Sequence, residues 1–283
     1  MSDAYHQLLD AAIQHVEELK ARGVRYVTVS PESLAALSQA PQKIAAPAAS
    51  VSTSAKMPAT QVTPPLLRAQ ALATTDPTKA AAFAELRSRA LVCVRCPNLA
   101  SSRKNVVFGV GNIETELMFV GEAPGADEDA EGEPFVGKAG QLLTKIIQTM
   151  GLSRDTVYIA NILKCRPDTP GQASGNRKPT PEEMATCIPY LHEQIDLIKP
   201  KVLVALGGTA VEGLLGKTMG IMKLRGNWQT YRGIPLMPTY HPAYLLRNQA
   251  MSEKRRVWED MLAVMEKLAM PISEKQRNYF TGA

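Results

Sequence analysis

The sequence predicts an α/β domain with a mainly parallel sheet in the part of the chain that begins near residue 80. Short apolar runs alternate there with amphipathic stretches, which is the pattern of repeated strand–helix–strand units. The predicted strands are 117–120, 157–160, 202–206 and 234–239, and the predicted helices are about 138–150, 181–198, 208–216 and 253–268. Because open α/β sheets bind ligands at the carboxyl ends of their strands, the residues that follow these runs are the first candidates for a site.

Composition supports a globular protein with a sizeable core. The 283 residues are 45% hydrophobic and 21% charged, a balance that argues against a wholly disordered chain. We find no apolar run long enough to span a membrane and no signal-peptide pattern at the N-terminus, so we expect a cytoplasmic protein without membrane contact. The net charge of +5 permits binding to nucleic acid but does not require it.

The chain outside the main domain is predicted to form three further parts. Residues 1–39 suggest a small helix–strand–helix extension with too little apolar surface for a core of its own. Residues 40–79 are rich in Ala, Pro, Ser and Thr and predict a flexible linker. The main domain would cover 80–270, and 271–283 would be a C-terminal tail. The sequence identifies no partner for the extension.

All four cysteines can belong to one metal centre. Cys93 and Cys96 form a C-x-x-C hook, Cys165 follows a predicted strand, and Cys187 lies in a predicted helix. Both zinc and iron–sulfur clusters accept four cysteines. The long separation between Cys165 and Cys187 modestly favours iron–sulfur, since structural zinc sites usually pair two short hooks. The alternative is four unrelated reduced thiols.

Candidate ligand-binding residues follow three of the predicted strands. Residues 121–125 read Gly-Glu-Ala-Pro-Gly, which suits a loop whose N–H groups approach a ligand or, equally well, an ordinary turn. Asn161 can hydrogen-bond a planar amide edge, although a turn or capping role is as common. His241 follows the last strand. A lone histidine is most often structural, but a position at the carboxyl end of a strand favours a functional role.

The glycine-rich segment that contains Phe135 gives one further candidate. Phe135 is either a local hydrophobic anchor or a flat surface on which a planar ligand can stack. Gly137 and Lys138 resemble part of a phosphate loop, but Ala139 stands where that motif needs Ser or Thr, which argues against an NTPase. The acidic residues at 127–133 are expected to form a solvated loop, most of it without a chemical role.

An apolar segment near the C-terminus is the last candidate. Tyr244, Leu245 and Leu246 precede Arg247. Such a segment is either the first turn of a helix or a wedge that inserts into a stack of bases.

In combination, these motifs resemble those of the family 4 uracil-DNA glycosylases. The matching segments, in the family's order, are the cysteine hook and residues 121–129, 134–143, 161–167 and 241–247. The resemblance covers about residues 80–268. It implies a three-layer α/β/α fold with a central, mainly parallel, four-stranded sheet. It also implies a monofunctional enzyme that hydrolyses the N-glycosidic bond of uracil in single- or double-stranded DNA, leaves an abasic site and initiates base excision repair.

The resemblance also assigns roles to residues at the base. Phe135 would stack on a flipped-out uracil, and Asn161 would read its amide edge. His241 would stabilise the uracil anion that cleavage releases. Backbone groups of residues 121–123, which are Gly121, Glu122 and Ala123, would meet a uracil oxygen. Ala123 occupies the position of an aspartate in related enzymes, so Glu122 would partly replace that carboxylate.

The cofactor and the DNA contacts are implied in the same way. A 4Fe-4S cluster would bind Cys93, Cys96, Cys165 and Cys187. Lys138, Tyr244, Leu245 and Arg247 would contact DNA, and we expect the protein to act as a monomer.

Two features depart from the family pattern. Residues 168–175 look like an insertion, and no histidine lies between Cys165 and Cys187, where relatives that become covalently trapped on their product carry one. We therefore expect no trapping. Two alternatives stay open: a catalytically weak iron–sulfur protein that only recognises damaged DNA, and a zinc-structured α/β protein of unrelated function.

Overall fold

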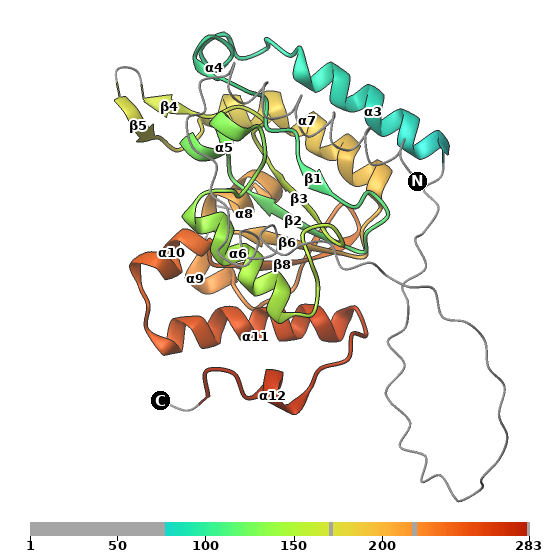
Figure 1. Cartoon of the computed structure of the whole chain (residues 1–283), viewed down its shortest axis with the longest axis vertical. Coiled ribbons are helices and arrows are strands. Elements are labelled where there is room, and N and C mark those ends of the chain that lie inside the picture. Colours follow the sequence, from blue (N-terminus) through green and yellow to red (C-terminus); the bar gives the residue numbers. More distant parts are fainter. Residues whose placement is uncertain (1–76, 170–171, 217–219, 282–283) are drawn as a thin grey trace, which may run out of the picture. The chain divides into compact units, whose positions relative to one another are not determined.

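The sheet at the centre of the molecule has four parallel strands between two short antiparallel ones. Figure 1 shows the computed structural model, which describes residues 77–169, 172–216 and 220–281. The strand order is β1-β3-β2-β6-β8-β7. The parallel strands are β3 (Tyr158–Asn161), β2 (Leu117–Gly121), β6 (Val202–Leu206) and β8 (Ile234–Thr239). The edges are β1 (Val110–Gly111) and β7 (Gln229–Tyr231).

The predicted mainly parallel sheet is confirmed, but it has six strands rather than four. All four predicted strands are present, with ends within one residue of the prediction. The two additional strands have only two and three residues, too few for an alternation or apolar run that would mark them in the sequence. The predicted extension at 1–39 and nearly all of the predicted linker lie outside the described residues.

Helices cover both faces of the sheet, which gives the expected three layers (Figure 1). On one face lie α3 (Pro77–Leu91), α7 (Pro181–Ile198) and α8 (Gly208–Leu215). On the other lie α6 (Lys138–Thr149) and α11 (Met251–Lys267). The shorter elements are α4 (Pro97–Ser102), α5 (Ala126–Glu131), α9 (Ile221–Leu224), α10 (Pro242–Arg247), α12 (Glu274–Arg277) and the hairpin β4 (Asp168–Thr169) and β5 (Gln172–Asn176).

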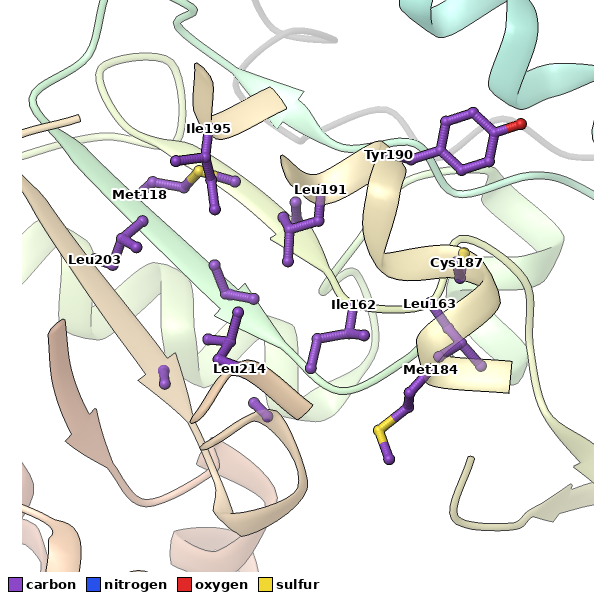
Figure 2. Packing of buried hydrophobic residues seen from close by; sticks show 14 of the residues in the cluster. Met118, Ile162, Leu163, Met184, Cys187, Tyr190, Leu191, Ile195, Leu203 and Leu214 are labelled. Atoms are coloured by element: carbon purple, nitrogen blue, oxygen red, sulfur yellow. The ribbon is translucent and has the colours of Figure 1, made fainter. Parts of the chain in front are cut away.

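Two separate hydrophobic cores hold these layers together. Successive strand residues point to opposite faces, so Met118 packs under α7 while Phe119 packs under α6 and α11. Figure 2 shows the first core, where Leu191 and Ile195 of α7 lie over Met118 and Leu203 of the sheet. Burial on both faces explains why the central strands are continuous apolar runs. None of the described helices combines the length and apolar character needed to span a membrane.

The acidic segment at 127–133 does not form the solvated loop that the sequence suggested. Most of it belongs to α5, and Asp129 is only 2% exposed. The Asp129 carboxylate accepts hydrogen bonds from the backbone N–H groups of Lys104 and Asn105. The helix was missed because its apolar face is a single turn long and a buried carboxylate looks in sequence like a solvated one.

Three smaller segments complete the described structure. Residues 168–176, where the sequence suggested an insertion, contain the β4–β5 hairpin. Pro77 begins α3, so the last residues of the predicted linker are helical. Beyond residue 270 the chain packs against α11, where Trp258 donates its indole N–H to the carbonyl of Gln276 and stacks edge-on with Tyr279.

Candidate functional site

The carboxyl ends of β2, β3 and β8 open into one cavity of about 410 Å³, a size typical of small-molecule sites. The residues that line this base cavity, as we call it below, are Glu122, Ala123, Pro124, Gly125, Glu128, Phe135, Ala139, Asn161, Pro167, Asn176, Arg177, His241, Ala243 and Arg247. The fold therefore brings together, from four separate parts of the sequence, most of the residues predicted to surround a base.

Asn161 carries an unsatisfied polar atom into this cavity. Its side chain is 1% exposed, and its Oδ1 accepts no hydrogen bond from the described residues. Leaving a buried acceptor unpaired is destabilising, so such atoms usually mark a place where a ligand or water supplies the donor. The amide therefore favours a ligand with a planar N–H and C=O edge.

The ring of Phe135 forms a neighbouring wall of the cavity. A Cβ added to Gly121 would lie 2.5 Å from Phe135 Cζ and 2.3 Å from Asn161 Oδ1. Only a glycine at the end of β2 therefore lets the ring and the amide approach each other so closely. The Phe135 and His241 rings lie with their centroids 5.6 Å apart and their planes tilted by 31°.

His241 is held as a neutral hydrogen-bond donor. It caps α10, and its Nδ1 accepts a hydrogen bond of 3.1 Å from the Ala243 N–H. Burial, assisted by the positive charge of Arg247, lowers the pKa of His241 to about 4. At neutral pH the proton of the ring is therefore on Nε2, where it can be donated. Gly207, with a φ of 92°, makes room for the His241 side chain.

Glu122 is the only carboxylate to which the sequence analysis assigned a role beside the bound base, and it is half-buried. Burial raises its pKa above the ordinary value, while a hydrogen bond with Thr209 and the charge of Lys178 act in the opposite direction. A carboxylate shifted in this way is a better proton acceptor near neutral pH than an exposed one. Ala123, next to it, contributes no polar side chain to the cavity.

Three lining residues with polar or charged side chains were not among the predicted site residues: Glu128, Asn176 and Arg177. The Glu128 carboxylate accepts hydrogen bonds from the N–H groups of Gly125, Val136 and Gly137. It thereby ties the loop after β2 to the loop that carries Phe135. Nothing in the acidic run distinguishes Glu128 from its neighbours, and Asn176 follows an insertion whose fold the sequence did not predict. The role of Glu128 could have been inferred only if the helix α5, on which it lies, had been predicted.

The residues predicted to contact DNA are only partly accessible. Lys138 is exposed at the start of α6 but does not line the base cavity, whereas Arg247 is exposed and does. The hydroxyl of Tyr244 donates to Glu253. The segment 244–246 lies in the helix α10, where Leu245 is 5% exposed and packs with Tyr240 and Val257. The helical turn of α10 instead points the next residue, Leu246, outward with 39% exposure.

The four cysteines line a second cavity, called the cysteine cavity below. Its walls also include Leu99, Arg103, Leu163 and Thr186, and all four thiols are free. The ligand candidates come from the end of α3, the start of α4, the segment after β3 and the middle of α7 (Figure 2 shows Cys187 on α7). The predicted convergence of the cysteines is therefore present in the fold.

The donors around these sulfurs suit metal-bound thiolates. The Arg103 guanidinium donates to Cys165 Sγ at 3.1 Å, and the Lys164 backbone N–H donates to Cys187 Sγ at 3.2 Å. Burial raises the pKa of Cys96 and Cys165, and that of Cys187 to about 11, and neighbouring cysteines add to each shift. These three raised pKa values favour the protonated thiols, so a metal bound by Cys96, Cys165 and Cys187 would have to displace their protons.

The spacing of the thiols bears on the kind of metal. Within the described part of the chain, no three His, Cys, Asp or Glu side chains are grouped closely enough to hold one ion. A tetrahedral zinc ion needs sulfurs about 3.8 Å apart, which follows from its Zn–S bonds of about 2.3 Å. A cluster of several irons accepts more widely spaced thiolates, each on its own iron.

Comparison with known proteins identifies the family. A family model for the uracil DNA glycosylase superfamily matches residues 108–262. The chain belongs to this superfamily. It is 48% identical to a Type-4 uracil-DNA glycosylase of Thermotoga maritima over 60% of this chain and 85% of that protein. It is 39% identical to a Type-4 uracil-DNA glycosylase of Sulfurisphaera tokodaii over 70% of this chain and 90% of that protein.

A more distant relative is a Type-5 uracil-DNA glycosylase of Pyrobaculum aerophilum, 31% identical over 56% of this chain and 81% of that protein. The superfamily match runs from the segment before β1 into α11, so it includes every residue of the base cavity. Cys165 and Cys187 lie inside it, whereas Cys93 and Cys96 precede it.

Proposed function

We propose that this member of the uracil DNA glycosylase superfamily removes uracil from DNA by hydrolysing its N-glycosidic bond, and so initiates base excision repair. The observation that carries this proposal is the unpaired, buried Oδ1 of Asn161, in a cavity whose lining also includes the Phe135 ring and the neutral His241. A base inside a duplex cannot reach such a cavity, so the nucleotide must be flipped out and read there on its Watson–Crick edge.

The Asn161 amide provides the selectivity for uracil. Its Oδ1 accepts the uracil N3–H, and its NH₂ donates to the uracil O4. Cytosine has no hydrogen on N3 and an amino group in place of O4, so it would leave both groups of the amide mispaired. Phe135 provides the flat apolar surface on which the base stacks.

His241 and Glu122 divide the chemistry between them. As the bond between C1′ and N1 breaks, negative charge develops on the uracil oxygens, and the Nε2–H of His241 donates a hydrogen bond to it. A water molecule then forms the new bond to C1′, and its proton passes to Glu122, whose pKa is raised by burial. The products are free uracil and an abasic sugar.

The product strand should stay intact. Cleavage of the abasic strand by elimination would need an amine nucleophile in the cavity, but within the described part of the chain no lysine lines it. Burial lowers the pKa of Lys164 to about 7, but this lysine is 2% exposed and its Nζ donates to Asn161 O and Gln194 Oε1. We therefore expect neither strand cleavage nor borohydride trapping.

The cysteine cavity is the proposed site of a 4Fe-4S cluster bound by Cys93, Cys96, Cys165 and Cys187. The convergence of the four cysteines on one cavity and the N–H donors to the sulfurs of Cys165 and Cys187 support this assignment. The proposed role is structural, because the ligands come from the turn after α3, the N-cap of α4, the segment after β3 and α7, and the cluster would join them. Anaerobically purified protein should be brown and contain iron and sulfide, whereas stoichiometric zinc would overturn this assignment.

DNA binding would depend on exposed basic side chains such as Arg247 and Lys138, and the affinity should therefore fall steeply as salt increases. We expect a cytoplasmic monomer that acts on single- or double-stranded DNA. A single-turnover assay with a uracil-containing oligonucleotide tests the function, and the matched cytosine oligonucleotide is its control. Binding of the uracil strand without any release of base would instead support the damage-recognition alternative.

A further inference from the structure

Phe135 has a backbone conformation that has to be held in place. Its φ is 56°, in the left-handed region that residues other than glycine rarely adopt. The ring it carries is 6% exposed and lies against Gly121 and beside His241. A return of this residue to an ordinary φ would swing the Cα–Cβ bond and remove the ring from its position in the base cavity.

Arg154, in the loop between α6 and β3, holds the Phe135 loop. Its Nη2 donates to the Pro134 carbonyl at 2.7 Å, and its Nη1 donates to the Phe135 carbonyl at 3.1 Å. One planar guanidinium thus fixes two consecutive peptide groups. Gly140 of α6 packs against the same Phe135 carbonyl so closely that an added Cβ would lie 1.8 Å from its oxygen.

The hydrogen bonds of Arg154 are directed inward rather than toward DNA. Among the described residues no carboxylate forms an ion pair with Arg154. Its guanidinium donates its hydrogen bonds to the carbonyls of the Phe135 loop. Burial lowers the pKa of Arg154, while Glu133 and Asp155 favour its charge from a longer distance. A half-buried cation with these partners is unlike an exposed arginine that waits for a phosphate.

We infer that Arg154 is a positioning residue for base stacking: its guanidinium fixes the loop so that the Phe135 ring is already in place when uracil enters. This inference rests on the proposed function. Arg154 would affect the binding and excision of the base, and it would not contact the phosphates of the DNA backbone.

The test compares Arg154→Met and Arg154→Lys with Arg87→Met, which removes an exposed positive charge on α3. Arg154→Met should slow single-turnover excision by about 10- to 100-fold, the usual loss when a reacting group is misplaced by about an ångström. Arg154→Lys should resemble Met rather than wild type, because one ammonium lacks the planar fork. Arg87→Met should match wild type. Wild-type activity in Arg154→Lys would show that charge alone suffices and would overturn the inference.

Two further measurements exclude other roles for Arg154. In a Phe135→Ala background, Arg154→Met should change the rate by less than about 2-fold, because the ring it positions is absent. Fully additive losses would overturn the inference. The slope of DNA affinity against salt should be the same in Arg154→Met and wild type, whereas a slope lower by about one would reveal a phosphate contact instead.

A readout without activity separates this inference from the proposed function. Fluorophenylalanine can be incorporated at the five Phe positions of the chain, and Phe135→Leu identifies one fluorine resonance as that of Phe135. This resonance should shift or broaden in Arg154→Met, even if the wild-type protein released no uracil. An unchanged resonance in a folded Arg154→Met protein would overturn the inference. Arg154→Gln replaces Met if the Met variant is insoluble.

Discussion

The base cavity and the cysteine cavity differ in how far the protein alone completes them. In the base cavity, hydrogen bonds within the chain already fix the groups around the empty space: Ala243 orients His241, and Glu128 and Arg154 hold the Phe135 loop. In the cysteine cavity, buried thiols with raised pKa values face one another, and two N–H donors point at sulfurs. The first is preorganised for a ligand that comes and goes, and the second, with the proposed cluster, would depend on a permanent one.

The two cavities are nevertheless joined through residues 161–165. The backbone N–H of Lys164 donates to Cys187 Sγ, while its buried ammonium donates to the carbonyl of Asn161. Gln194 of α7 accepts from the same ammonium and donates to Tyr158 and to the Phe108 carbonyl. Loss of the cysteine-bound group should therefore also disturb the backbone that carries Asn161, whereas changes at the base should not affect the cysteines.

The largest expected effect is that of Cys187→Ala. The variant should lose iron and sulfide, most of its soluble yield and all excision together, because the cluster joins α7 to three other segments. Metal analysis, yield and circular dichroism measure this. Thr186→Ala, at a neighbouring non-ligand position in the same cavity, is the matched control and should keep its iron. A soluble, fully active Cys187→Ala protein would contradict the structural role.

His241→Ala should show the opposite behaviour. Excision should fall by about 10² to 10³, the usual loss for one donor to a developing anion, while iron content and melting temperature stay close to wild type. His192→Ala serves as the control, since His192 pairs with Tyr231, which does not line the base cavity. Equal rates in the two variants would remove His241 from the mechanism.

The low pKa of His241 also gives a prediction about pH. A histidine whose folded pKa lies near 4, below its ordinary value of 6.5, contributes stability that is present above about pH 6.5 and is lost as the pH falls toward 4. In nuclear magnetic resonance titrations its ring should stay neutral from pH 8 to pH 5.5. Titration near pH 6.5 would show that the ring is not buried as described.

The sequence predicted the parts of this protein that have a repeating pattern or a motif. The central strands could be predicted because burial on both faces makes them apolar runs. Asn161 and His241 could be placed in the cavity because each follows a strand, and Phe135 because it lies in a glycine-rich motif. Glu128 and Arg154 could not, since each acts through hydrogen bonds to backbone groups of the Phe135 loop. Such partners depend on three-dimensional packing and have no characteristic spacing in the sequence.

Asn161→Asp tests whether this amide recognises the base. We expect the change to affect the preference for uracil over cytosine more than the rate of uracil excision. The NH₂ donor at the uracil O4 becomes an acceptor, which suits the amino group of cytosine. Uracil excision should fall, and the ratio of cytosine to uracil release should rise. Analysis of the released bases measures this ratio, with Asn176→Asp, at another asparagine of the cavity lining, as control. An unchanged ratio would mean that another group reads this edge.

The smallest effect is expected for Leu246→Ala, which tests whether this exposed leucine acts as a wedge. Leu246 is 39% exposed at the end of α10, so its truncation should leave the melting temperature unchanged, whereas Leu245→Ala should destabilise the fold by about 2 to 5 kcal/mol because Leu245 lies in a core. A wedge helps only where a base has to leave a stack of paired bases. Leu246→Ala should therefore slow excision from double-stranded DNA by less than about 10-fold and leave single-stranded DNA unaffected. Equal losses on both substrates would indicate a general contact with the strand rather than a wedge.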